Sequence, residues 1–187
     1  ESVRTCAISQ SLRRCWHRKK ILLPGGEENL LNLGGNMRLK TKYFGEIDCP
    51  ESDMLRFPDG LFGFEGEKEF FLLPFEGGEG SLLCFQSAAT PGLAFVAMNP
   101  FSLKPDYAPV LSGRELEALE VERSEDLCFY TLCVVRSPVS DSTVNLRCPV
   151  AVNDQTRRAM QVILEGGGYQ MHHPLSEFGR TEEGAPC

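Results

Sequence analysis

The sequence lacks any long apolar stretch. Its longest near-apolar run, residues 127–135, is nine residues long and contains Thr131. A helix that spans a membrane needs about 20 apolar residues. The apolar segment of a signal peptide, about 7–15 residues, is also missing, because only the Ile-Leu-Leu of residues 21–23 follows the N-terminal basic cluster. We therefore predict no membrane span and no secretion.

The motifs of common enzyme classes are absent as well. The sequence has no phosphate loop ending in Gly-Lys-Ser/Thr, no dinucleotide fingerprint, no His-Glu-x-x-His and no Gly-x-Ser-x-Gly turn. The three histidines, His17, His172 and His173, lie near the two ends of the chain. A histidine-assisted nucleophile would therefore have to be built from tail residues. We predict that the protein is not an enzyme and uses no cofactor.

None of the eight cysteines forms a Cys-x-x-Cys pair. Cys84, Cys128, Cys133 and Cys148 lie in apolar runs, where a thiol behaves as a small buried hydrophobe. This favours reduced cysteines in a cytoplasmic protein, with a disulfide framework as the alternative. Adjacent histidines at 172–173 would point in different directions on an extended chain, so we predict no metal site.

The net charge of −7 is unevenly distributed along the chain. Residues 1–36 hold six basic and three acidic residues, whereas the remainder holds 13 basic and 23 acidic residues and carries −10. Such a body repels nucleic-acid phosphate, so we predict no direct nucleic-acid binding. It attracts a basic protein.

Residues 1–36 form a basic extension that does not resemble the rest of the sequence. They are interpreted either as a disordered basic arm or as translated sequence upstream of the true start. We favour a start at Met37, because Gly34-Gly35-Asn36 is what a purine-rich ribosome-binding site spells when it is read as codons. Residues 37–175 are then the folded domain, and residues 176–187 are a frayed tail.

From Met37 onward the pattern is that of an all-β domain, predicted as a compact, antiparallel, β-barrel-like structure with one short helix. Short runs of branched and aromatic residues alternate with Pro, Gly, Asp and Ser. Ser112 and Glu115 form a capping box that begins the helix. The run at 127–136 is apolar on both faces and predicts a central strand. The predicted strands are 38–47, 54–57, 70–73, 82–87, 94–99, 127–136, 144–152 and 160–164.

The run Phe57-Pro58-Asp59-Gly60-Leu61-Phe62-Gly63-Phe64-Glu65 predicts a chain that bends twice and presents phenylalanines. These rings are interpreted either as a plug that closes the core or as exposed anchors for a partner. The same two interpretations apply to Phe101 and to Asp106-Tyr107 in a Pro-rich connector.

A second candidate site is acidic. Six carboxylates lie within residues 115–126: Glu115, Glu117, Glu120, Glu122, Glu125 and Asp126. A run of this kind is either a solvated face or a docking surface for a basic partner.

Several short motifs occur in a fixed order along residues 37–175. They are residues 41–47 (TKYFGEI), the run 57–65, residues 86–87 followed by 93–96 (LAFV), residues 100–101 with 105–107 (PDY), residues 145–146 with 149–150, Asn153, residues 161–162 and residues 173–175 (HPL). In this ordered series the sequence resembles the flagellar assembly factor FliW family. Three positions depart from the family pattern: Phe62 replaces a usual proline, Val144 replaces a small residue, and Cys148 lies where a small apolar residue is common.

The resemblance implies a cytoplasmic protein that binds two partners. One is flagellin before its export, and the other is CsrA, a basic translational repressor whose hold on flagellin mRNA is relieved by the binding. We expect Glu115, Glu117, Glu120 and Glu122 to face CsrA. We expect Phe62, Phe64, Phe101, Asp106 and Tyr107 to contribute to partner docking, with the aromatic rings lining a groove for amphipathic helices of flagellin.

Two other classes of function stay open at this point. A small β-barrel enzyme or ligand carrier would use Gln86-Ser87 and Asp106-Tyr107 as polar groups in a cavity. A structural subunit would assemble through an edge strand.

Overall fold

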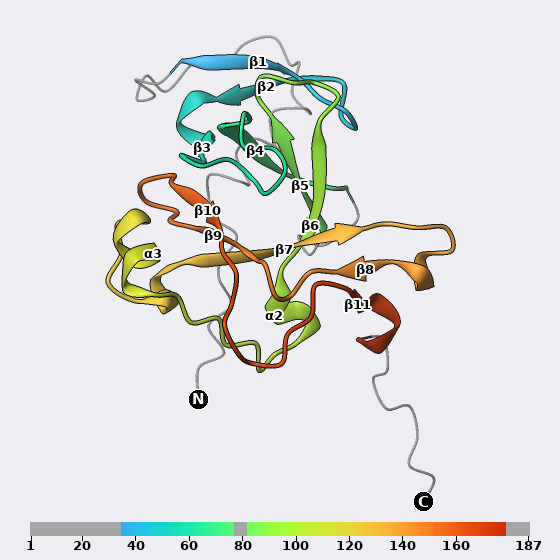
Figure 1. Cartoon of the computed structure of the whole chain (residues 1–187). Helices are drawn as coiled ribbons and strands as arrows, with labels where there is room; N and C mark the ends of the chain where they lie inside the picture. Colours follow the sequence, from blue (N-terminus) through green and yellow to red (C-terminus); the bar gives the residue numbers. More distant parts are fainter. Residues whose placement is uncertain (1–34, 77–81, 179–187) are drawn as a thin grey trace, which may run out of the picture.

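The computed structural model describes residues 35–76 and 82–178, which form a mostly β structure with antiparallel strand pairing (Figure 1). Two α-helices and four short 3-10 helices connect the strands within these residues. The strands are β1 Asn36–Lys40, β2 Glu46–Pro50, β3 Leu55–Arg56, β4 Glu69–Pro74, β5 Leu82–Ser87, β6 Ala94–Met98, β7 Cys128–Val134, β8 Thr143–Val144, β9 Val150–Val152, β10 Ala159–Gln161 and β11 His173–Pro174. The α-helices are α2 Pro100–Leu103 and α3 Gly113–Ala118.

The first predicted strand, 38–47, is wrong, because this segment is a hairpin. β1 pairs with β2 in a separate two-stranded sheet. The turn between them is closed by Thr41, whose N–H and hydroxyl both donate to the Gly45 carbonyl, at 2.9 and 2.7 Å. Gly45 has a φ of +69°, which glycine adopts at little cost. The turn chemistry of Thr41 and Gly45 thus overrides the apolar alternation.

The main sheet runs in the order β10-β9-β7-β6-β5-β4-β3, and β8 pairs with both β7 and β11. Its two ends approach at one point, where Arg56 and Arg158 form an isolated bridge and the Arg56 N–H donates to the Arg157 carbonyl at 2.8 Å. No closed barrel forms among the described residues, so this part of the fold prediction is corrected. The reason is length, because β3 has two residues and β10 three, too few for a closing ladder.

The predicted strand 144–152 is also interrupted. It divides into β8 and β9, and the residues between them turn back on themselves. The Asn145 N–H donates to the Leu132 carbonyl at 3.0 Å, and the Asn145 side chain accepts the Cys148 N–H at 2.8 Å. An asparagine that bonds the backbone ahead of it favours a turn over a continuous strand. The predicted hairpin of β9 and β10 is present, with Val152 opposite Ala159.

The expectation of a single short helix is wrong, because the described chain has two. The capping box at Ser112 begins α3 as predicted. The missed helix, α2, begins at Pro100, and the side chain of Asn99 accepts the Phe101 N–H at 2.9 Å. An N-cap Asn followed by Pro at the first helical position is a known start signal.

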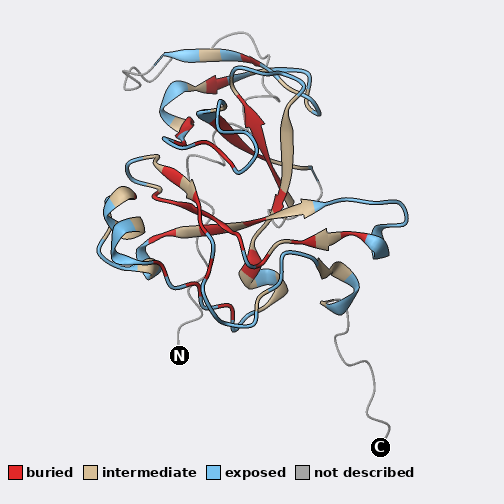
Figure 2. Ribbon diagram, viewed as in Figure 1, coloured by how far each residue is buried: buried red, intermediate tan, exposed pale blue. Residues whose placement is uncertain are grey.

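Three apolar cores lie beneath these elements (Figure 2). One contains Phe57, Phe70 and Phe85 under the β3–β6 part of the sheet. The second contains Tyr107, Phe129 and Leu146 and is packed by residues of α2 and α3. The third, around Leu39 and Phe71, joins the β1–β2 hairpin to β4. β7 contributes residues to the first two cores and pairs with β6, β8 and β9, as expected of a central strand.

The predicted extension 1–36 lies outside the described residues except for Gly35 and Asn36, and Asn36 begins β1. In the predicted tail 176–187, Ser176 and Glu177 belong to a 3-10 turn, and Phe178 packs against the core that contains Tyr107. The rest of that tail lies outside the described residues. Within the described part of the chain, no helix has the length and apolar character needed to cross a membrane.

Candidate partner-binding surfaces

The acidic surface lies along α3 and the residues that follow it. One of the predicted carboxylates, Glu115, caps the first turn of this helix. The Glu115 carboxylate accepts the N–H and the hydroxyl of Ser112, each at 2.7 Å, and the Ser112 hydroxyl accepts the Glu115 N–H at 3.4 Å. This reciprocal capping satisfies donors that a helix start leaves without partners. Glu115 is therefore engaged within its own helix.

The C-terminal end of α3 places the next carboxylate. The Val121 N–H donates to the Leu116 carbonyl, and the Glu120 N–H donates to the Glu117 carbonyl, which is a Schellman motif. Glu120 therefore has a φ of +59°, a conformation usually taken by glycine because a side chain costs about 1–2 kcal/mol there. The chain thus carries a carboxylate at a position where glycine would be more stable.

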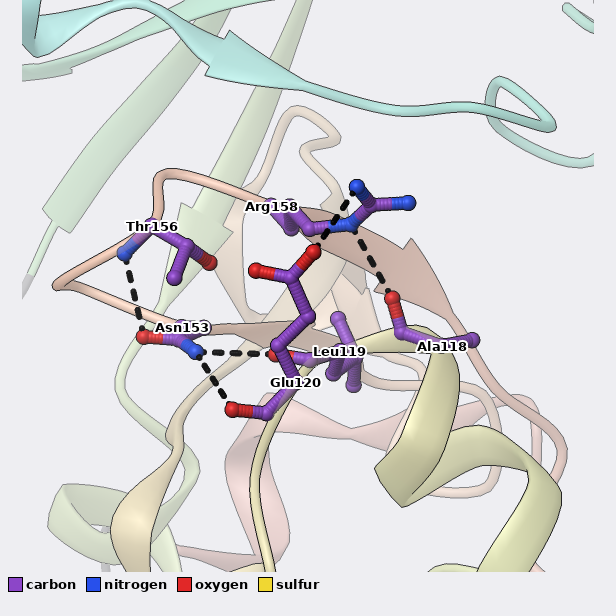
Figure 3. A network of polar contacts seen from close by, with 6 residues as sticks. All are labelled: Ala118, Leu119, Glu120, Asn153, Thr156 and Arg158. Carbon is purple, nitrogen blue, oxygen red and sulfur yellow. Dashed lines mark hydrogen bonds and ion pairs between the residues drawn. The ribbon is translucent and has the colours of Figure 1, made fainter.

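Side chains from the β9–β10 hairpin hold this helix end in place (Figure 3). The Asn153 amide donates to the carbonyls of Leu119 and Glu120, at 2.8 and 3.4 Å. Arg158 donates through Nε to the Ala118 carbonyl and through Nη1 to Glu120 Oε1, both at 3.1 Å. The contacts satisfy the last carbonyls of the helix and connect it to the main sheet.

An open depression lies between this helix end and the β9–β10 turn. Its volume is about 530 Å³, and it includes three of the four acidic residues predicted to face a partner, Glu117, Glu120 and Glu122. The full lining is Glu117, Glu120, Val121, Glu122, Asp126, Asn153, Gln155 and Thr156. The residues from the β9–β10 turn were not predicted as site residues. Asn153, at the start of a polar turn, was the available signal.

The aromatic run 57–65 divides into buried and exposed rings. Phe57 is fully buried, whereas Phe62 is 51% exposed and Phe64 is 40% exposed. Gly60 and Gly63, with φ of +75° and +80°, supply the two bends. The Phe64 ring meets Phe95 edge to face at 4.9 Å. The run therefore contains one ring buried in the core and two exposed rings, and the role of the exposed rings as partner anchors stays a prediction.

Polar contacts hold the exposed turn against the sheet. The Phe62 N–H donates to the Gln161 side chain at 3.0 Å. The Glu67 carboxylate accepts the Ser87 and Thr90 hydroxyls at 2.6 and 2.5 Å, and these bonds lower the pKa of Glu67. These bonds connect the turn to β10 and to the end of β5.

The Pro-rich connector places its aromatic rings inward. Tyr107 is 3% exposed, and its hydroxyl donates to the Leu146 carbonyl at 2.8 Å. Burial is the main cause of the raised pKa of Tyr107. Phe101, which is partly buried, lies 5.7 Å from the Tyr107 ring. Asp106 is exposed and bonds to Lys104, which lowers the pKa of Asp106.

The predicted site residues therefore do not form one site. Phe62 and the acidic depression both contact the β9–β10 hairpin, through Gln161 and Arg158. Phe101 and Tyr107 belong instead to the core beneath α2. No group of three or more His, Cys, Asp or Glu within the described ranges is arranged to hold a metal ion. Cys84, Cys133 and Cys148 are free thiols, and burial raises the pKa of Cys84 and of Cys133 to about 12.

Comparison with known proteins gives concordant matches. The family model described as "FliW protein" matches residues 38–175. The flagellar assembly factor FliW of Geobacillus sp. (strain WCH70) is 40% identical over 139 residues, which are 74% of this chain and 95% of that protein. The FliW of Syntrophus aciditrophicus is 34% identical over 81% of this chain and 95% of that protein. A solved structure, "Crystal structure of the flagellar assembly factor FliW", matches with a TM-score of 0.69 and 36% identity, covering 79% of this chain and all of that one.

The fold and its surfaces define a mostly β protein of antiparallel sheets with an open acidic depression and exposed aromatic rings. The matches extend over most of the described chain and nearly the full length of the relatives. The chain belongs to the FliW family of flagellar assembly factors, a family of assembly factors and not of enzymes.

Proposed function

We propose that this protein binds the basic translational repressor CsrA and relieves its repression of flagellin mRNA, and that it also binds flagellin before export. The observation that carries the first part is the acidic depression, which Glu117, Glu120 and Glu122 line together at the C-terminal end of α3, where Arg158 and Asn153 bond the last carbonyls of the helix. Both partners are encountered in the cytoplasm, where we expect the protein to act.

Electrostatics supports a basic partner at this depression. Residues 113–126 contain six acidic and two basic residues. One of the bases, Arg123, is paired with Asp126 at 3.1 Å. Exposed ion pairs are each worth only about 0.2–1 kcal/mol, so the main effect of such a surface is to speed encounter and to orient the partner. Negative charge beside CsrA also disfavours RNA phosphate.

An RNA-release assay tests this function directly. CsrA is first bound to a labelled flagellin leader RNA, and the purified protein is then added in increasing amounts. We expect the RNA to be released as the protein saturates CsrA, without chemical turnover of any small molecule. Retention of the RNA by CsrA at saturating protein would contradict it.

The exposed rings of Phe62 and Phe64 support the flagellin part of the proposal. Large aromatic side chains supply much of the energy of protein interfaces, and an amphipathic helix docks on an apolar surface of this kind. Flagellin retention on the immobilised protein, compared between the wild type and a Phe62→Ala variant, tests it. Equal retention would assign the flagellin surface elsewhere.

A further inference from the structure

β6 has one open backbone edge in the middle of the main sheet. It pairs with β5 along its whole length, from Ala94 to Met98. On the other side it pairs with β7 only at Ala97 and Met98. No other described strand pairs with Ala94, Phe95 or Val96 on that side. On the N-terminal side of Ala97, β6 and β7 separate, and β7 continues into its hairpin with β8 (Figure 1).

The hydrogen-bond alternation of the ladder shows which backbone groups face this edge. The Ser87 N–H donates to the Leu93 carbonyl at 3.0 Å. Because antiparallel pairs alternate in their bonding, Phe95 and Ala97 also direct their N–H and C=O groups toward β5. Ala94 and Val96 therefore direct theirs toward the open edge, where an added strand finds two donors and two acceptors.

The edges of β1, β3 and β11 carry the usual protection against pairing. On β1, Arg38 and Lys40 lie in ion pairs with Asp48 and Glu46. β3 is two residues long and meets the β9–β10 hairpin through the bridge of Arg56 with Arg158. β11 is two residues long and ends at Pro174. Charge, shortness and proline are the common means of blocking edge pairing.

The open edge of β6 carries none of these features. Ala94–Met98 contains no charged residue and no proline, and Ala94, Phe95 and Val96 are all partly exposed. The Phe95 ring contacts the exposed Phe64 ring on one face of the sheet. Val96 lies on the opposite face, because neighbouring side chains of a strand alternate. The edge is thus apolar on both faces.

We propose that the β6 edge binds an extended, uncharged peptide segment of a partner protein by strand addition. The segment pairs with Ala94 and Val96 and places apolar side chains beside Phe95 and Val96. Its lack of charge matches the edge, which offers no ion pair. A second copy of this chain fits less well, because it brings β5 with β6 and meets the β7–β8 hairpin that projects on this side (Figure 1).

A synthetic peptide tests the proposal. The probe is a fluorescent, end-capped, uncharged peptide of alternating valine and threonine, and its control is the same peptide N-methylated at alternate residues. Strand addition expects saturable binding of the probe and loss of binding for the control, because methylation removes the ladder donors and keeps the side chains. Equal binding of both peptides would overturn it.

A matched pair of protein variants locates the site. Val96→Pro removes the N–H that faces the open edge and leaves the bonds to β5 intact, whereas Val96→Thr keeps that N–H. We expect a loss of about tenfold in probe affinity for the proline variant, the worth of one backbone hydrogen bond, and less than about threefold for the threonine variant. Equal affinities would place the probe elsewhere.

Amide hydrogen exchange of the unmodified full chain gives a reading that does not depend on how the variants fold. The Val96 N–H should exchange rapidly and the Phe95 N–H slowly, and the probe should protect Val96. Strong protection of Val96 without probe, or protection that rises with protein concentration together with a dimer in sedimentation, would overturn the proposal.

Discussion

The turn at residues 57–67 and the connector at residues 100–126 look alike in sequence, since each combines prolines or glycines with aromatic and acidic residues. In the structure the two regions expose different kinds of side chain. The turn exposes Phe62 and Phe64. The connector buries Tyr107 and exposes carboxylates at the end of α3. One region presents apolar surface and the other charge, which suits two partners of different chemistry.

The difference arises from the backbone conformation of the turn and from a buried hydrogen bond in the connector. In the turn, Gly60 and Gly63, which both have positive φ, lie on either side of the buried Leu61 and the exposed Phe62. In the connector, the Tyr107 hydroxyl satisfies the buried Leu146 carbonyl, so the ring stays inside. Exposure of an aromatic residue is therefore decided by backbone bonding that composition does not reveal.

The largest expected effect is on the buried side of this comparison. Tyr107→Ala removes a ring packed against Phe101 and Tyr169 and should lower the free energy of unfolding by about 3–5 kcal/mol. Tyr107→Phe keeps the ring and leaves the Leu146 carbonyl without its donor, so the free energy of unfolding should fall by about 1–3 kcal/mol. Urea denaturation measures both. A change below 1 kcal/mol for Tyr107→Ala would show that the connector does not depend on this ring.

The next effect concerns the two glycines of the exposed turn, which form a matched pair. A Cβ at Gly60 would lie 2.7 Å from the Glu65 Cα and the Phe64 carbonyl oxygen, whereas nothing lies within 4 Å of a Cβ at Gly63. Both have positive φ, so each alanine substitution should lower the free energy of unfolding by about 1 kcal/mol. Gly60→Ala should lower it by about 1–3 kcal/mol more, because the backbone must shift. Thermal or urea unfolding that ranked them equally would contradict the close approach.

Phe62→Ala should separate function from stability on the exposed side. Because this ring is half exposed, its removal should change the free energy of unfolding by less than about 1 kcal/mol. Flagellin retention should fall by at least about tenfold if the ring is an interface anchor. Pull-down and denaturation of the same preparation measure the two quantities. Full retention by the folded variant would remove Phe62 from the proposed flagellin surface.

A fourth prediction concerns Glu120 on the charged side. Glu120→Gly relieves the positive φ, worth about 1 kcal/mol, and removes an exposed ion pair with Arg158, worth about 0.2–1 kcal/mol. Stability should therefore be unchanged or up to about 1 kcal/mol higher, while CsrA affinity falls. Glu120→Ala, which keeps the strained backbone, is the control for loss of the carboxylate. Unchanged CsrA affinity in both variants would remove Glu120 from the proposed interface.

The smallest expected effect is a pH dependence at the exposed turn. Hydrogen bonds from Ser87 and Thr90 lower the pKa of Glu67. A group whose pKa is lower in the folded state stabilises the fold above its unfolded pKa, and this contribution is lost as the pH falls through the folded value. Stability should thus decline in the acid range below pH 4.5. Glu67→Gln should flatten that decline, and an identical acid profile in the variant would exclude Glu67 as its source.

Several elements were accessible from sequence because one local signal dominated. The capping box of Ser112 and Glu115 fixed the start of α3, and β5 matches its apolar run at 82–87. The prediction failed where turn chemistry interrupts an apolar pattern, at Thr41 to Gly45 and at Asn145. The prediction of a barrel-like fold also failed at closure, because closure depends on pairing between segments far apart in the chain, which no local pattern encodes.

The candidate site was predictable only in part for a related reason. The run of carboxylates marked Glu117, Glu120 and Glu122, which line the depression together. Its other wall comes from residues 153–156, about thirty residues further along the chain. The hydrogen bonds of Asn153 and Arg158 to the end of α3 bring the two walls together. Such long-range contacts are properties of the fold and not of the motif.

The affinity of CsrA for two triple variants of equal charge is the most direct test of this account. One variant reverses Glu117, Glu120 and Glu122 to Lys, and the other reverses Glu51, Glu69 and Glu165, which are exposed and lie outside the depression. Measured at low salt with both variants folded, the first should lose at least about tenfold in affinity and the second less than about threefold. Equal affinities would show that CsrA does not bind at the acidic depression.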